Sequence, residues 1–390
     1  MILIAGFPYI REAYFDTFRH YPEPNQLIFL LPKVWKIKDG KIIFYPPKDS
    51  RVNTSRAFFF HSHYPIIGGL LKGWMPWFPL ILWRKRKEIS LVYSCSEPNL
   101  LTTLYYGFWS KLLGKKHILF SWENIPYWEK FGRTNWMIKK IIIKLNLFLS
   151  DGIICGNKKG EEIFKQLTHK PIAVIPMSGV DAELFKPKEH LRVFNGYDWS
   201  DKVIFTFAGA IGYRKGIHNI IESFRTVIES APKARLVIAG TGEYELEIEE
   251  AMRKYDLVDY VTRFSWIKHD DLPKLFDASD VFLYPSIPSG GWEEQFGYSI
   301  AEASLMELPI ITTNSGSITD LVINEKTGLI VEPGDAMALA NAMIRLADDR
   351  NLRLEFGKNG REYIEKHFAY KKVAQDFYDF FSSLLFGENK

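Results

Sequence analysis

The chain has 390 residues, 47% of them hydrophobic, which is long enough for two or three domains with sizeable cores. Its two cysteines, Cys95 and Cys155, each end a strand-like run, so a disulfide framework or cysteine-based zinc site is excluded and a reducing compartment is favoured. The net charge of +4 is unevenly distributed: residues 1–175 have 26 Lys and Arg against 12 Asp and Glu, whereas the remainder has 24 against 34. A balance of +14 in the first half indicates an anionic partner, such as a membrane surface, a lipid phosphate or nucleic acid.

Strand-like and helix-like segments alternate along the first half. The opening run MILIAGF has no basic flank of the kind that precedes a signal peptide's apolar core, and we expect it to be a first buried strand. Further strands are predicted at 27–32, 41–46, 89–95, 117–124, 151–157 and 171–177, with helices near 98–113 and 134–149. Short connections between such elements are typical of a parallel sheet flanked by helices.

The second half repeats this pattern. Strands are predicted at 203–210, 234–240, 260–266, 281–286, 309–313 and 328–333. A polar segment without periodicity separates the halves near 176–200, and a long helical pattern with aromatic residues on one face follows residue 360. Two doubly wound domains are therefore expected, and ligands of such sheets bind at the carboxyl ends of the strands.

Residues 290–316, GGWEEQFGYSIAEASLMELPIITTNSG, are the most informative stretch. Glu294 and Glu302 stand eight residues apart, and Phe296 and Gly297 mark the point where a loop becomes a helix. The free N–H groups and positive dipole of a helix start can hold a phosphate without a metal. Two carboxylates about 9 Å apart along the helix axis would then suit the hydroxyls at both ends of a nucleotide sugar.

Simpler explanations exist for both carboxylates. Glu294 alone could be a capping or dipole partner of the helix. Glu302 is harder to explain in this way, because Ile300, Ala301 and Ala303 predict a largely buried helix, where an unpaired carboxylate is costly.

This stretch resembles the retaining GT-B glycosyltransferases, in particular glycosyltransferase family 4. The resemblance lies in the spacing of the two glutamates, the motif EQFGYSIAEA and the following GLIVEPGD at 328–335. The resemblance implies an α/β GT-B fold, with two Rossmann-like doubly wound domains facing across a cleft. An N-terminal acceptor-side domain is expected at 1–177, completed by a C-terminal crossover helix at 368–390. The nucleotide-sugar-binding domain is expected at 178–367, after a PMSGVDAELFKP segment that resembles the family's interdomain junction.

The segment FAGAIGYRKGIHNIIESF, residues 207–224, resembles the family's G-R-L-x-x-x-K-G motif. Lys215 and Gly216 match its lysine and glycine, but Ala210 stands where the motif has arginine. Cations at this point can neutralise a departing diphosphate, although a solvated basic loop would have the same composition. Whether Arg214 replaces the missing arginine stays open.

The resemblance also implies a set of donor-binding residues, with backbone at 266 and 267 holding the nucleobase. These are Glu302, Phe296, Gly297, Tyr298, Gly209, Gly212, Trp266, Ile267 and Glu123. Trp266 could equally belong to a core, and Glu123 could bind either a sugar hydroxyl or an internal donor. The loop after the first strand has one glycine, Gly6, where most family members have two, so this sequence departs from the family pattern at the loop that would lie under the acceptor.

The expected reaction is retaining transfer of a hexose from a nucleoside-diphosphate sugar to an acceptor hydroxyl, on a lipid-linked acceptor or a growing glycan. Glu294, Lys215 and Arg214 are the expected catalytic residues, and neither a metal nor a cofactor is expected besides the donor substrate. The alternatives are a phosphorylase or nucleotide-sugar epimerase of the same fold, or a non-catalytic binding protein at a membrane.

Residues 57–87 are rich in tryptophan and end in the four cations of Arg84 to Lys87. Proline and glycine interrupt any regular spanning helix there. Core packing is the alternative, but we expect this segment to dock on a membrane, with Trp74, Trp77, Phe78 and Trp83 at the headgroup boundary. His61 and His63 share a strand spacing but have no visible third metal ligand. We expect a cytoplasmic protein without a nucleic-acid partner, for which docking would use the cytoplasmic face of the membrane.

Overall fold

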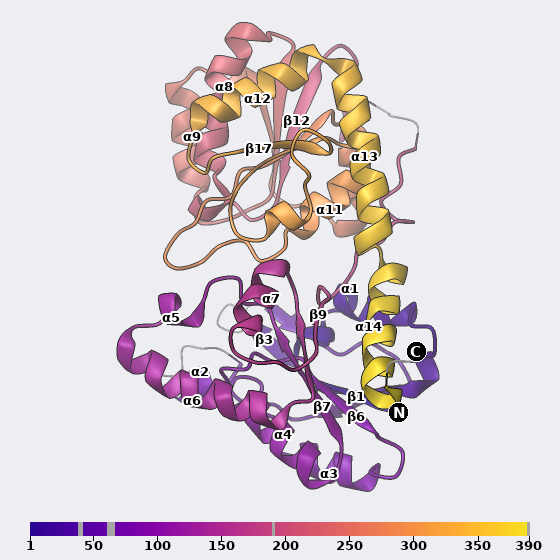
Figure 1. Ribbon diagram of the computed structural model, residues 1–390. Helices are drawn as coiled ribbons and strands as arrows, with labels where there is room; N and C mark the ends of the chain where they lie inside the picture. The colour runs from indigo at the N-terminus through magenta and orange to yellow at the C-terminus, as the bar shows by residue number, and fades with distance from the viewer. Residues whose placement is uncertain (38–41, 61–66, 189–191, 388–390) are drawn as a thin grey trace. The chain divides into compact units, whose positions relative to one another are not determined.

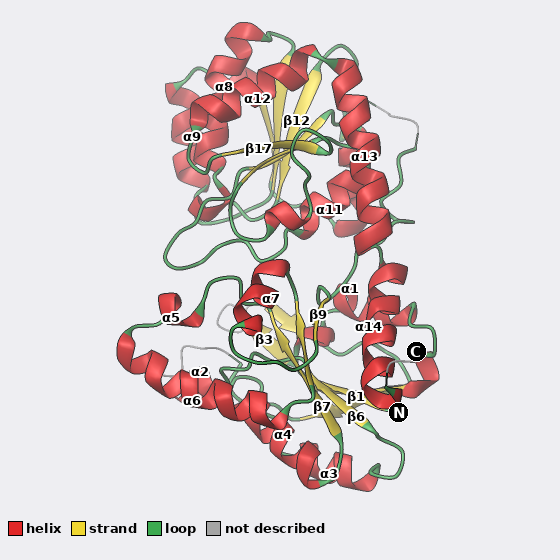
Figure 2. Cartoon of the chain, in the orientation of Figure 1, coloured by secondary structure: helices red, strands yellow, loops and turns green. Residues whose placement is uncertain are grey.

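The computed structural model describes residues 1–37, 42–60, 67–188 and 192–387 (Figure 1). The chain divides into two compact units, Met1–Gly179 with Tyr370–Lys390, and Val180–Ala369. Each unit has one parallel sheet between helices (Figure 2). His61 and His63 lie outside the described residues.

The first unit contains a seven-stranded parallel sheet in the order β5-β2-β1-β6-β7-β8-β9. Its strands are β1 (Ile2–Ala5), β2 (Leu27–Pro32), β5 (Val52–Ser55), β6 (Leu91–Ser94), β7 (Lys116–Ser121), β8 (Gly152–Cys155) and β9 (Ile172–Val174). Its α-helices are α1 (Glu12–Phe15), α2 (Ile67–Leu70), α3 (Phe78–Arg84), α4 (Leu101–Leu112), α5 (Tyr127–Lys130), α6 (Arg133–Leu149), α7 (Lys158–Lys165) and α14 (Tyr370–Phe386). Short 3-10 helices lie at Pro8–Ile10, Asp16–Arg19 and Pro24–Gln26.

Both faces of this sheet are buried, which explains why its strands are continuous apolar runs. Ile2 and Ile4 of β1 point into a core shared with Phe377 of α14. The alternate residue Leu3 points into a second core shared with Phe78 of α3. Both predicted helices of this half are present, and the cysteines Cys95 and Cys155 are free and buried.

Two strands of this unit differ from the prediction. The run predicted at 41–46 forms β4 (Ile42–Phe44), which pairs antiparallel with β3 (Trp35–Ile37) in a separate hairpin. The edge strand of the main sheet is instead β5, whose sequence VNTS has polar residues at an edge where one side is left unpaired.

The second unit contains a six-stranded parallel sheet in the order β14-β13-β12-β15-β16-β17. Its strands are β12 (Val203–Ala208), β13 (Ala234–Ala239), β14 (Val261–Phe264), β15 (Val281–Tyr284), β16 (Ile310–Thr313) and β17 (Gly328–Val331), and a hairpin of β10 (Val193–Phe194) and β11 (Tyr197–Asp198) precedes them. Its α-helices are α8 (Ile217–Ser230), α9 (Glu245–Lys254), α10 (Leu272–Asp277), α11 (Tyr298–Leu305), α12 (Ala336–Asp348) and α13 (Arg350–Phe368). Its 3-10 helices are Tyr213–Lys215, Val258–Tyr260, His269–Asp271 and Ile318–Asp320.

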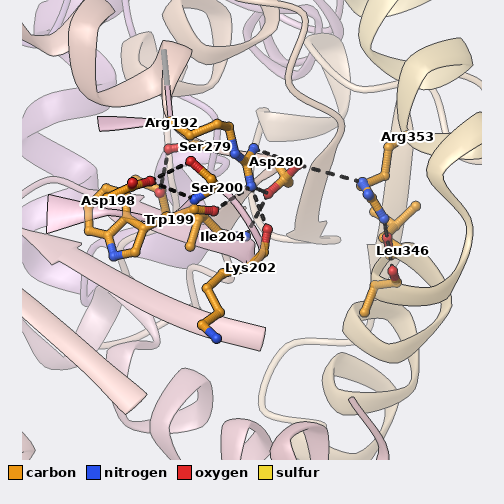
Figure 3. Close-up of polar contacts among 12 residues, drawn as sticks. Arg192, Asp198, Trp199, Ser200, Lys202, Ile204, Ser279, Asp280, Leu346 and Arg353 are labelled. Carbon is orange, nitrogen blue, oxygen red and sulfur yellow. Dashed lines mark hydrogen bonds and ion pairs between the residues drawn. The ribbon is translucent and has the colours of Figure 1, made fainter. Parts of the chain in front are cut away.

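Asp280 joins several segments at the amino ends of β12 and β15 (Figure 3). Its carboxylate accepts from the backbone N–H of Ile204 at 2.7 Å and pairs with Arg192 at 2.8 Å. Arg353 of α13 lies 4.0 Å from its other oxygen. This polar cluster fixes the entry to the sheet at the edge opposite the carboxyl ends of the strands.

The long helical pattern predicted after residue 360 is two helices, α13 and α14, separated at Ala369. Ala369 has extended backbone, with φ −65° and ψ 152°. Phe377 and Phe381 of α14 are buried in the first unit, which explains the aromatic face seen in the sequence. Within the described ranges, none of the helices combines the length and the hydropathy that a bilayer crossing requires.

Candidate active site

Lys215 and Glu294 meet where the strand order of the second sheet reverses. β12 and β15 are neighbours, although β13 and β14 lie between them in sequence. Lys215 ends the 3-10 helix after β12, and Glu294 lies in the loop after β15. Their side chains form an ion pair and are 17% and 10% exposed. Such a reversal point, at the carboxyl ends of the strands, is where open α/β sheets bind ligands.

The Glu294 carboxylate is surrounded by donors. Besides Lys215, the Tyr284 hydroxyl donates to its Oε2 at 2.9 Å and the Ser286 hydroxyl lies at 3.4 Å. Burial, followed by the charge of Glu294, raises the pKa of Tyr284 well above its usual value, so this phenol stays a neutral donor. Glu294 therefore lies in a preorganised polar network. The sequence alone had also allowed a simple capping role for it.

The backbone of Glu294 is held by the turn after β16. Ser317 donates its N–H to the Glu294 carbonyl at 2.8 Å. Gly316 has φ +63°, and a Cβ placed on it would lie 2.1 Å from the same carbonyl oxygen. Only glycine allows this approach, so the SGS turn fixes the position of the glutamate.

Arg214 is exposed and stacks on an indole. Its Cζ lies 3.9 Å from the centroid of the Trp292 ring, and Lys215 Nζ lies 5.6 Å from that centroid. The carbonyl of Arg214 accepts from the N–H of Ile287 at 2.9 Å, which ties the two loops together. Ala210 is exposed on the same loop. Trp292 thus positions the two adjacent cations Arg214 and Lys215. The sequence did not predict this role, although Trp292 lies two residues before Glu294.

Helix α11 begins at Tyr298, after Gly297 with φ +95°. Phe296 is buried and packs against Phe368, with ring centroids 5.5 Å apart, and against Tyr298 at 4.8 Å. Phe296 therefore anchors the helix start in the core of its unit, so its part in donor binding would be indirect.

Glu302 lies one turn into α11 and contacts the loop after β14. The ring nitrogen Nε2 of His269 is 2.9 Å from Oε1 of Glu302. This hydrogen bond is the first cause of a raised pKa for His269. Ile300, Ala301 and Ala303 are buried as expected. The Glu302 carboxylate, which would be costly to bury unpaired, has His269 as its partner. His269 was not identified from the sequence, although it lies two residues after the backbone at 266 and 267 that was expected to hold the base.

The glycines at the ends of β12 and β13 pack backbone against backbone. A Cβ on Gly240 would lie 1.8 Å from the carbonyl oxygen of Gly209, and one on Gly242 would lie 1.9 Å from that of Ile211. Gly212 directly precedes the 3-10 helix Tyr213–Lys215. Gly240 and Gly242 thus mark a close approach of two loops, which fixes the path of the chain toward Lys215.

Trp266 is 77% exposed and lies outside the core. With Ile267 and Phe194 it lines a cavity of about 510 Å³. None of Glu294, Lys215 and Glu302 lines this cavity.

In the first unit, Glu123 is buried and pairs with Lys130 at 2.8 Å, so it has an internal donor. The sequence reasoning missed Glu97, which follows β6 and accepts from the Trp122 N–H and the Ser121 hydroxyl, each at 2.7 Å. Burial, followed by the charge of Glu123, raises the pKa of Glu97 to about 7. Its place after a buried strand, in SCSEPN, was the available signal.

Segment 57–87 is partly core. Phe78 is fully buried, so its expected place at a membrane boundary is wrong, whereas Trp77 and Trp83 are exposed. Trp74 is half-buried against Tyr105, with ring centroids 5.9 Å apart. Among the residues that the structure describes, no three His, Cys, Asp or Glu side chains are grouped as a metal site would require.

Comparison with known proteins finds a family match within the second unit. Residues 194–363 match the family described as "Glycosyl transferases group 1". The capsular polysaccharide biosynthesis glycosyltransferase CapM of Staphylococcus aureus is 31% identical over 187 residues, covering 48% of this chain and 47% of CapM. The UDP-Gal:alpha-D-GlcNAc-diphosphoundecaprenol alpha-1,3-galactosyltransferase of Escherichia coli is 30% identical over 252 residues, covering 60% of each chain. The chain thus spans about half the length of the curated relatives it matches.

Structural similarity extends over both units. The Anabaena protein Alr3699/HepE, crystallised with UDP, superimposes with a TM-score of 0.75 at 16% identity, covering 98% of this chain and 99% of that one. This likeness concerns the fold, and it confirms an α/β architecture with two Rossmann-like domains. The resemblance drawn from EQFGYSIAEA is confirmed as well: the chain carries a glycosyl transferases group 1 domain on a GT-B fold.

Proposed function

We propose that the chain is a retaining glycosyltransferase that moves a hexose from a nucleoside-diphosphate sugar to an acceptor hydroxyl. The observation that carries the proposal is the Lys215–Glu294 pair at the reversal point of the second sheet, beside the start of α11. The pair puts a cation and a carboxylate where a diphosphate and a sugar would lie next to each other. The second unit, 180–369, would bind the donor, and the first unit would present the acceptor.

Roles follow from position. Lys215, Arg214 and the start of α11 would neutralise the departing diphosphate, which needs no metal ion. Glu294 would orient the sugar hydroxyls and Glu302 the ribose. The backbone at 266 and 267 would hold the base, beside the neighbouring cavity.

In the proposed reaction the bond from the anomeric carbon to the phosphate oxygen breaks, and a bond to the acceptor oxygen forms on the same face. The acceptor proton passes to the departing phosphate oxygen, so the structure need not supply a protein base or nucleophile. Preorganised charge at the diphosphate is then the main source of rate enhancement.

The acceptor is proposed to be lipid-linked or a growing glycan. The printed name of the E. coli relative contains a diphosphoundecaprenol acceptor, and CapM is named for capsular polysaccharide synthesis. UDP sugars are the first donors to test, because the Anabaena neighbour was crystallised with UDP. The enzyme would work in the cytoplasm, docked at the membrane through exposed residues of segment 57–87, such as Trp77 and Trp83.

Release of nucleoside diphosphate, measured with and without lipid-linked and glycan acceptors, tests the proposal. Acceptor-dependent release with retained anomeric configuration, read by NMR, is the expected result. Release that requires only phosphate would indicate a phosphorylase, and interconversion of sugars without release would indicate an epimerase. Nucleotide binding without any turnover would indicate a binding protein.

A further inference from the structure

Helices α4 and α6 of the first unit pack side by side (Figure 1). Together they carry seven exposed apolar side chains. The amide of Asn146 donates to the carbonyls of Pro98 and Leu100 at 2.8 and 3.1 Å, which fixes α6 to the start of α4. The exposed apolar side chains, 45–78% accessible, are Phe108, Leu112, Met137, Ile138, Ile141, Leu145 and Phe148. We call these seven residues the α4–α6 face. Exposed apolar residues grouped in this way, unlike scattered ones, indicate an interaction site.

Helix α6 has three distinct sides. At 100° per residue, the buried residues Ile142, Asn146 and Leu147 occupy one side, and the exposed apolar residues of the α4–α6 face occupy another. Exposed Lys140 and Lys144 lie between the two. A helix that only covered a sheet would have a polar outer side. This one has an apolar outer side with a cationic border, as in helices that lie in a bilayer interface.

A groove of about 570 Å³ runs along this face. Leu104, Tyr105 and Phe108 of α4 line one side, and Leu145 and Phe148 of α6 line the other. These are apolar or aromatic side chains, so the groove suits a hydrocarbon chain better than a polar ligand.

Helices α3, α4 and α6 carry charges of one sign, although Lys111 pairs with Asp151 and the adjacent helix α5 carries Glu129. Helices α3, α4 and α6 contain no Asp or Glu, and their cations are Arg84, Lys111, Arg133, Lys139, Lys140 and Lys144. Helix α3 contacts α4 through Phe78 and Tyr106, whose ring centroids are 4.6 Å apart. Beyond it, Arg86 stacks on exposed Trp83 at 4.4 Å. A second copy of the chain would bring like charges together at this surface, whereas an anionic lipid surface would be complementary to it.

We propose that the α4–α6 face is the membrane-docking surface of the first unit, with α6 lying in the interface of an anionic bilayer and the groove receiving a lipid chain. At 17 residues, α6 is about 25 Å long, which suits a helix that lies in the interface. This deepens the proposed membrane contact by moving its centre from segment 57–87 to α4 and α6. The proposed docking surface rests on the proposed function only for the reason why the protein would bind a membrane.

The test is cosedimentation of the full chain with vesicles of phosphatidylcholine alone or mixed with phosphatidylglycerol. Binding should require the anionic lipid and weaken with salt. The variant Met137→Gln/Ile141→Gln/Phe148→Gln keeps the charge and should lower the vesicle partition coefficient at least about tenfold. Its matched control, Leu246→Gln/Met337→Gln/Leu354→Gln, alters exposed apolar residues of the second unit and should bind like wild type.

A second variant removes charge from the border of the face. Arg133→Gln/Lys140→Gln/Lys144→Gln should lower partition onto anionic vesicles about 100-fold, at roughly fivefold for each cation. Lys233→Gln/Lys358→Gln/Lys366→Gln removes the same charge from exposed positions of the second unit and should have little effect. Circular dichroism and thermal melting verify that each variant is folded.

Equal recovery with neutral and anionic vesicles, or unchanged binding in both α4–α6 variants, would overturn the proposal. Self-association in light scattering that is lost in the apolar variant, without vesicle binding, would assign the face to a second copy instead. UDP binding by calorimetry reports the donor site independently. If vesicle binding holds but no nucleotide binds, the proposed transferase fails and the docking surface stands.

Discussion

His269 and Glu302 join the 3-10 helix after β14 to helix α11 through a hydrogen bond of 2.9 Å between Nε2 and Oε1. Because this bond raises the pKa of His269 above its unfolded value, the stabilisation is fully present below about pH 6.5. It is lost as pH rises through the raised pKa. Urea unfolding at pH 5.5, 7 and 8.5 should show this loss in wild type and not in His269→Gln. A variant with the wild-type pH dependence would show that the contact carries no stability.

The Lys215–Glu294 pair should matter for both stability and transfer. Glu294→Gln leaves a largely buried ammonium without its charged partner, which should lower the free energy of unfolding by about 3 kcal/mol. Lys215→Met should have a similar cost. The double variant should regain much of the loss, because neither charge is left alone.

Activity separates the two roles in the same variants. Glu294→Ala, Glu294→Gln and the double variant should all lack acceptor-dependent nucleotide release at temperatures where they are folded. Near-normal turnover in a folded Glu294 variant would refute its proposed role in orienting the sugar.

The strands and part of the site could be predicted from the sequence for one physical reason. Parallel strands buried on both faces are continuous apolar runs, such as LIFLLP, which forms β2 at Leu27–Pro32. Strand β5 was not predicted, because its sequence VNTS lies at the sheet edge and is polar. The hairpin β10–β11 escaped although Asn195 and Gly196, with φ +47° and +84°, are a recognised turn pair.

The charged partners were less predictable than the carboxylates. Glu294 and Glu302 stand in a motif, but Trp292 and His269 acquire their roles through contacts between loops that follow different strands. Sequence spacing gives the position of a residue along its own element. It does not give the contacts across a sheet edge that decide which side chains meet.

Metal dependence is the next prediction. If the helix start and Lys215 hold the diphosphate, activity should survive EDTA, and Lys215→Ala should raise the barrier by about 2 to 4 kcal/mol, as for loss of one preorganised charge stabiliser. Arg214→Ala, measured in the same assay, tests whether the exposed guanidinium on Trp292 contributes. Loss of turnover in EDTA with rescue by magnesium or manganese would contradict the metal-free proposal.

Glu97 should make the folded state less stable as pH rises, which is the opposite of the effect of an ion-paired carboxylate. Its pKa is raised to about 7 from 4.5, so protonation favours the folded state. The contribution is fully present below about pH 4.5 and is lost as pH rises to about 7, a change of about 3 kcal/mol. Glu97→Gln should remove this loss and gain relative stability at pH 8. Glu129→Gln, on exposed surface of α5, is the control for removing a charge.

Gly316→Ala tests whether the SGS turn holds Glu294 in place. The new Cβ would lie 2.1 Å from the Glu294 carbonyl, so the turn or the glutamate must shift. Gly334→Ala is the matched control, since Gly334 also has positive φ, at +82°, but a Cβ there would meet nothing within 4 Å. Both variants should show the backbone cost of about 1 to 2 kcal/mol. Only Gly316→Ala should also lower turnover, by at least about tenfold, because displacement of a positioning group by 1 Å can cost that much or more. Equal turnover in the two variants would mean that the turn does not set the position of Glu294.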